Sequence, residues 1–183
     1  MKVTKMVCLG DSIVWGFPYG PQYSWVGIAA GVLVFPMINR GINGETAEDL
    51  HARFQRDVIA CAPSHVFIMV GTNDASINVP LESYQDGILK MNGEASLHGI
   101  TPILGLPIPS SDKWLEGRLE KYRSWLKVFS SANCVGLVDF SPVMLSPEKT
   151  VNRECYTDEV HPSKTGYRSM ASLFVEFCRG YLK

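Results

Sequence analysis

The stretch Val7-Cys8-Leu9-Gly10-Asp11-Ser12 decides the fold. Its apolar run stops abruptly at Gly10, and a small acid and a hydroxyl follow at once. This pattern predicts a strand that ends in a sharp turn and leaves Ser12 exposed at its carboxyl end. Parallel α/β sheets place their ligands along that edge. Gly, Asp and Ser are also ordinary turn residues, so this stretch alone does not distinguish a nucleophile from a plain turn.

On both sides of this turn, short apolar runs alternate with longer amphipathic segments. The apolar runs predict five strands, at residues 3–9, 32–38, 66–70, 100–106 and 135–140. The amphipathic segments predict helices at residues 22–33, 46–60, 80–99, 114–129 and 162–179. This alternation predicts an α/β fold, a doubly wound, five-stranded parallel sheet between two helical layers, joined by right-handed crossovers.

Length and composition limit the classes of protein that this chain can belong to. The 183 residues suit one domain, spanning 1–183, with a sizeable core. Lys and Arg total 17 against 18 Asp and Glu, so no basic excess favours nucleic acid as a partner. The longest apolar stretch, residues 26–38, contains Pro36 and is far too short for a membrane span. We therefore expect no membrane insertion.

The cysteines and the start of the chain bear on the cellular location. The five cysteines are odd in number and scattered, and no CxxC motif occurs. This usage argues against a disulfide framework or a zinc site and favours buried thiols in a reducing compartment. The start, MKVTKMVCLGDS, lacks the apolar run and cleavage pattern of a secretory signal. A cytoplasmic location is the expectation.

The loops that follow the predicted strands carry polar residues suited to acyl transfer. They are Gly10 to Ser12, Asn39 to Thr46 (NRGINGET), Gly71 to Asp74 (GTND) and, before the last helix, Asp158 to Pro162 (DEVHP). Because the carboxyl ends of parallel strands meet at one edge, we expect these four segments to lie together. Each segment on its own also reads as a turn or a helix start, but the ordered set of four is much rarer.

Acyl transfer assigns a task to residues of each of these segments. A serine hydroxyl needs a base to take its proton, and His161, held at the helix entry by Pro162, can act as that base for Ser12. Asp158 can fold back to orient the imidazole. The oxyanion needs preorganised donors. The backbone N–H of Gly44, the side-chain amide of Asn73 and the backbone N–H of Ser12 can supply them.

These motifs resemble those of the SGNH hydrolases, the GDSL-type esterase and lipase superfamily, over nearly the whole chain. The resemblance implies a three-layer α/β/α, flavodoxin-like fold with strand order 2-1-3-4-5. It implies Ser12 as nucleophile, His161 as base and Asp158 as its orienter, with Gly44 and Asn73 in the oxyanion hole. Two features depart from a simple match: Ile13 replaces the usual leucine, and Gly41 is an alternative to Gly44.

The chemistry predicts a serine esterase that hydrolyses small carboxylic esters, with short acyl or acetyl groups, through an acyl-enzyme intermediate. The same machinery also suits a thioesterase or lysophospholipase, or a carbohydrate O-deacetylase. A catalytically silent acyl- or carbohydrate-binding module is the alternative from another class, and the complete triad argues against it. No cofactor or metal is implied. The sequence leaves the natural substrate and the oligomeric state open.

Two further groups of polar residues have simpler expected roles. Asp11 and Asp74 adjoin the catalytic segments, and we expect both to fix loops by accepting backbone hydrogen bonds. His51, His65 and His98 are isolated from one another along the chain, so surface or packing roles are expected for them rather than metal ligation.

Overall fold

The computed structural model describes residues 3–182. A five-stranded parallel sheet lies at the centre of the fold. The strand order is β2-β1-β3-β4-β5. The strands are β1 (Met6–Gly10), β2 (Met37–Gly41), β3 (His65–Met69), β4 (Thr101–Gly105) and β5 (Gly136–Val138). This topology confirms the predicted doubly wound sheet and its 2-1-3-4-5 order.

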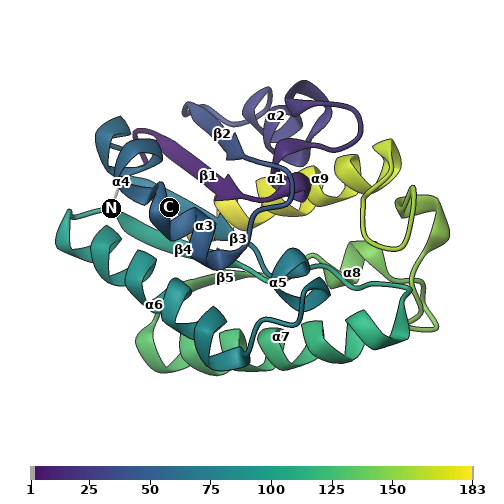
Figure 1. Cartoon of the computed structure of the whole chain (residues 1–183). Helices are drawn as coiled ribbons and strands as arrows, with labels where there is room; N and C mark the ends of the chain where they lie inside the picture. The colour runs from purple at the N-terminus through teal and green to yellow at the C-terminus, as the bar shows by residue number, and fades with distance from the viewer. Residues whose placement is uncertain (1–2, 183) are drawn as a thin grey trace.

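Helices cover both faces of the sheet (Figure 1). One face is covered by α2 (Trp25–Ala30), α8 (Ser141–Met144) and α9 (Lys164–Tyr181). The other is covered by α3 (Ala47–Ala52), α4 (Phe54–Asp57), α6 (Leu81–Leu97) and α7 (Lys113–Asn133). Two short helices, α1 (Ser12–Trp15) and α5 (Thr72–Ser76), and three 3₁₀ turns, η1 (Pro21–Tyr23), η2 (Ile59–Cys61) and η3 (Arg153–Cys155), complete the described elements.

Alternation of side chains along the strands divides the core into two apolar clusters. Met6 and Cys8 of β1 point to the face where Trp25 packs against Phe67 and Phe174. Val7 and Leu9 point to the opposite face and join the buried stripes of α3, α6 and α7. All strand residues of β1 and β3 are buried, as expected for central strands of a parallel sheet with helices on both sides.

The second strand is the clearest error of the sequence prediction. We expected it at residues 32–38, but β2 runs from Met37 to Gly41. Val32 and Val34 are exposed and lie in the connection after α2. β2 is an edge strand with mostly half-buried residues, so its sequence, MINRG, carries only a weak apolar signal.

The helix predictions differ from the structure mainly at their ends and at one break. The helix expected at residues 22–33 is a 3₁₀ turn followed by α2, which begins after the Ser24 cap. The helix expected at residues 46–60 is interrupted at Arg53, whose backbone leaves the helical region between α3 and α4. The last helix begins at Lys164 with Ser163 as its cap, so Pro162 precedes this helix rather than opening it.

Candidate active site

The segment that carries Ser12 turns sharply because Gly10 leaves room for close backbone contacts and Asp11 caps the helix that follows. A Cβ on Gly10 would lie 2.4 Å from the carbonyl oxygen of Met69, so only glycine fits where β1 ends. Asp11 caps α1, since its Oδ1 accepts the backbone N–H of Ile13 at 2.9 Å. Ser12 is therefore the first residue of α1, and it is 7% exposed rather than exposed as expected from the sequence.

The hydroxyl of Ser12 meets the imidazole of His161 across the sheet edge. Ser12 Oγ lies 3.1 Å from His161 Nε2, although the two residues are 149 positions apart in the chain. His161 Nδ1 lies 2.8 Å from Asp158 Oδ2. With the Nδ1–H donating a hydrogen bond to the carboxylate, Nε2 is free to accept the serine proton. The structure thus brings together the three residues that the sequence suggested as a triad.

The segment from Tyr156 to Pro162 forms a tight loop that fixes Asp158 and His161 relative to each other. Asp158 Oδ1 accepts the backbone N–H groups of Val160 at 2.8 Å and of His161 at 2.7 Å. The Thr157 N–H donates to the His161 carbonyl at 2.8 Å. Partial burial raises the pKa of Asp158, but these N–H groups and the imidazole outweigh it and hold that pKa below its ordinary value. Asp158 is therefore a preorganised carboxylate.

An aromatic side chain supports the imidazole from the side of the nucleophile loop. The Phe17 ring lies 4.6 Å from the His161 ring, centroid to centroid. The Tyr167 hydroxyl of α9 donates to the Phe17 carbonyl at 2.8 Å, which ties this loop to the helix that follows the base. Phe17 therefore helps to fix the plane of the imidazole.

The two residues expected in the oxyanion hole lie on neighbouring segments that contact each other. Gly44 has a φ of 84°, and no atom lies within 4 Å of the position that a Cβ would take there, so the space beside this residue is open. Asn73 lies in α5, which begins after Gly71 at a φ of 133°. Its Nδ2 donates to the carbonyl of Glu45 at 2.9 Å. One N–H of the Asn73 amide is thus engaged, and the other is available.

The other glycine of this segment is placed differently. Gly41 ends β2, and a Cβ there would lie 2.2 Å from the backbone nitrogen of Trp15. Its own N–H donates to Asn39 Oδ1 at 2.9 Å.

Two buried carboxylates fix the catalytic segments, as the sequence suggested. Asp74 accepts the Ala47 N–H at 3.0 Å and so connects the segment of Asn73 to the start of α3. Burial raises the pKa of Asp74 to about 6. Burial also raises the pKa of Asp11 to about 7, and the nearby acids Asp74 and Glu45 add to this shift.

Arg53 is a buried cation that the sequence analysis did not single out. It is 6% exposed and bonds to Glu45, Asp57 and two backbone carbonyls. One signal was available: Arg53 stands three residues after Leu50 and one before Phe54, which places a charge within the buried stripe of the predicted helix.

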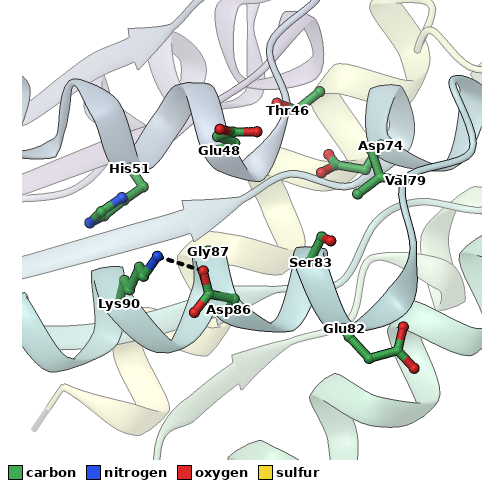
Figure 2. A pocket seen from close by; sticks show the side chains of 10 residues that line it. All are labelled: Thr46, Glu48, His51, Asp74, Val79, Glu82, Ser83, Asp86, Gly87 and Lys90. Atoms are coloured by element: carbon green, nitrogen blue, oxygen red, sulfur yellow. Dashed lines mark ion pairs between the residues drawn. The ribbon is translucent and has the colours of Figure 1, made fainter.

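A cavity of about 480 Å³ lies between α3 and α6 (Figure 2). Its lining includes Thr46 and Asp74, which directly follow Glu45 and Asn73. Figure 2 also shows the Lys90–Asp86 ion pair along α6, with Nζ and Oδ2 2.6 Å apart. Neither Ser12 nor His161 lines this cavity, so it borders the segments of Thr46 and Asp74 rather than Ser12.

Within residues 3–182, no group of three or more His, Cys, Asp and Glu side chains is arranged to hold a metal ion. The helices of the same described part of the chain include none that is both long and apolar enough to cross a bilayer.

The chain is similar to several known proteins. The model of a family described as the GDSL-like lipase/acylhydrolase family matches residues 8–169. The uncharacterized lipoprotein YqeF of Bacillus subtilis is 36% identical over 117 residues, which cover 57% of this chain and 48% of YqeF. The chain thus aligns with about half the length of that relative. An acetylxylan esterase of Geobacillus stearothermophilus is 27% identical over 93% of this chain and 92% of its own.

A solved structure matches almost the whole chain. A protein of Desulfitobacterium hafniense, assigned to a lipolytic G-D-S-L family, superposes with a TM-score of 0.90 at 31% identity. The superposition covers 95% of this chain and 99% of that one.

Proposed function

This chain belongs to the GDSL-like lipase/acylhydrolase family, and on that premise we propose that it hydrolyses short-chain carboxylic esters, acetyl esters above all, with Ser12 as nucleophile. Membership confirms the resemblance inferred from the sequence and the expectation of an ester-hydrolysing enzyme. The observation that carries the proposal is the pair of contacts Ser12 Oγ–His161 Nε2 and His161 Nδ1–Asp158 Oδ2, at 3.1 and 2.8 Å.

In the proposed reaction, Ser12 Oγ attacks the ester carbonyl carbon while His161 Nε2 takes the hydroxyl proton. The tetrahedral intermediate collapses, the bond to the alcohol oxygen breaks, and His161 returns the proton to that oxygen. Water then attacks the acyl-enzyme, again giving its proton to His161. Collapse of the second intermediate releases the acid and returns the proton to Ser12. Asp158 stabilises the imidazolium at both stages.

We assign the oxyanion hole to the backbone N–H groups of Gly44 and Ser12 and to the amide of Asn73. The free Asn73 N–H and the open space at Gly44 support this assignment. Gly41 is a poorer candidate than Gly44, because its N–H already donates to Asn39. Donors held by backbone and by a hydrogen-bonded amide need little reorganisation when charge develops on the substrate oxygen.

One observation favours a small acyl group. The acetylxylan esterase aligns with 93% of this chain, so an acetyl ester of a carbohydrate is the variant that a relative supports. Thioester and lysophospholipid substrates use the same triad and remain alternatives of substrate rather than of mechanism.

The proposal is tested by comparing rates on 4-nitrophenyl acetate, butyrate and decanoate, acetyl-CoA and acetylated xylo-oligosaccharides. We expect the highest kcat/KM on an acetyl oxygen ester and loss of several orders of magnitude in Ser12→Ala. A maximum on decanoate or acetyl-CoA would contradict the acetyl-ester assignment. Hydrolysis by Ser12→Ala at the wild-type rate would contradict the mechanism.

We further propose that residues 1–183 act as one domain in the cytoplasm. Both apolar clusters pack on the same sheet, which supports a single unit. All five cysteines lie in the described residues and are free thiols, the state typical of a reducing compartment.

A further inference from the structure

Arg53 stands at a junction of three segments that meet at the catalytic edge. It occupies the break between α3 and α4, where the backbone leaves the helical region and turns the side chain inward. The side chain is 6% exposed. A cation so deeply buried persists only when its N–H groups are paired, because desolvating an unpaired charge is costly.

The guanidinium joins the carboxyl ends of two neighbouring strands. Its Nη2 donates to the carbonyl of Gly10 at 3.1 Å and to that of Arg40 at 2.9 Å. Gly10 is the last residue of β1, two positions before Ser12. These contacts fix the guanidinium relative to the strand that carries the nucleophile.

The same guanidinium also holds the segment that carries the proposed oxyanion donors. Its Nε donates to Glu45 Oε2 at 2.6 Å. The carbonyl of Glu45 in turn accepts Asn73 Nδ2 at 2.9 Å, and Glu45 directly follows Gly44. Asp57 is the second carboxylate of this cluster, and its Oδ2 accepts a hydrogen bond from Nη1 at 2.8 Å. A continuous chain therefore runs from β1 through Arg53 and Glu45 to Asn73.

We propose that Arg53 is a positioning residue for the oxyanion hole: it fixes Glu45 against the end of β1 and thereby sets the places of the Gly44 N–H and the Asn73 amide. This inference rests on the proposed function. Arg53 itself is not placed to touch substrate, so its effect is on geometry. A displacement of about 1 Å in such a site can cost on the order of a hundredfold in rate.

Lysine is the substitution that tests this role, because it keeps the charge but not the planar fork that serves four partners. With 4-nitrophenyl acetate we expect kcat of Arg53→Lys to fall at least about tenfold while KM changes less than about threefold. The pH profile on its acid side should keep the wild-type midpoint, since the Ser12–His161–Asp158 contacts are untouched.

Two control variants separate positioning from general destabilisation. Arg56→Lys alters the exposed cation that shares Asp57 with Arg53, and its kcat should stay within about twofold of wild type. Leu126→Ala removes a buried side chain of α7 and should lower the melting temperature strongly, yet with kcat also within about twofold. If Leu126→Ala loses kcat as Arg53→Lys does, the effect is one of stability and the inference fails.

A double-mutant cycle with Asn73→Ala is the decisive step. If part of the effect of Arg53 passes through the Asn73 amide, the cost of Arg53→Lys should be at least about threefold smaller once Asn73 is removed. Equal costs in both backgrounds would overturn the inference. Should Arg53→Lys fail to fold, Glu45→Gln weakens the same chain with little change in shape, because the neutral amide loses the charge-assisted hydrogen bond from Arg53. It should lower kcat about fivefold, and an unchanged kcat would overturn the inference.

The outcomes also separate this inference from the proposed function. A wild-type protein without ester hydrolysis would refute both. A wild type that is active and loses kcat in Asn73→Ala, but not in Arg53→Lys, would refute the role of Arg53 alone.

Discussion

At the scale of single residues, the site is built on carboxylates with opposite environments. Asp158 is half exposed and receives three hydrogen bonds, so its pKa lies below the ordinary range despite partial burial. Asp11 is buried beside other acids, and its pKa is raised to about 7. Asp158 is thus kept charged beside His161, while Asp11 holds the turn before Ser12 by accepting the backbone N–H of Ile13.

The raised pKa of Asp11 predicts a pH-dependent stability. Because the folded state keeps this proton to higher pH than the unfolded chain, the stabilisation is complete below about pH 4 and is lost as pH rises through about 7. Between pH 5 and 8 this group should lower the free energy of unfolding by on the order of 2 kcal/mol. Asp11→Asn keeps the acceptor for Ile13 and should remove that part of the slope.

Urea unfolding of both proteins at pH 5 and pH 8 measures this difference. Parallel pH dependence in wild type and Asp11→Asn would show that Asp11 is not the titrating group.

Asp158 permits a matched test on its own loop. Asp158→Asn presents an amide to His161 Nδ1 and disfavours the tautomer that accepts the serine proton, so kcat should fall by about 10² to 10⁴. Glu159→Gln neutralises the adjacent exposed acid and should leave kcat within about twofold. Equal kcat values for the two variants, measured on 4-nitrophenyl acetate, would argue against a role for Asp158 in orienting the base.

At the scale of elements, glycines in different settings predict opposite responses to alanine. Gly44 has a positive φ, so Gly44→Ala should cost about 1 kcal/mol of stability and disturb the proposed oxyanion segment. Gly117 lies exposed within α7, where alanine is the better helix former, so Gly117→Ala should add about 0.5–1 kcal/mol. Thermal unfolding measures both. A stabilising Gly44→Ala would show that its backbone conformation is not strained.

The elements also show what could be read from the sequence and what could not. Central strands such as β3 were predicted within one residue, because full burial on both faces gives a continuous apolar run. β2 was misplaced because an edge strand needs fewer apolar residues, while exposed Val34 imitated a core position. The break at Arg53 was missed because it is stabilised by carbonyls of distant strands, which helical periodicity does not reveal.

At the scale of the whole molecule, the parallel sheet explains why four short motifs sufficed to suggest the site. The loops that carry Gly44, Ser12 and Asn73 follow the adjacent strands β2, β1 and β3, in that order, and the carboxyl ends of these strands meet at one edge. The loop of His161, which precedes α9, reaches the same edge, since His161 Nε2 lies 3.1 Å from Ser12 Oγ. The order of the motifs after successive strands predicted which residues meet. The hydrogen bonds that link Arg53 through Glu45 to Asn73 are visible only in the structure.

Active-site labelling tests the central claim, that Ser12 is a nucleophile activated by His161 and Asp158. A fluorophosphonate probe should modify the wild-type protein once, at Ser12, as located by mass spectrometry of the digested chain. Ser12→Ala should not be labelled, and His161→Ala should react more slowly by about two orders of magnitude or more. No reaction of the wild type, or equal labelling of Ser12→Ala, would contradict the claim.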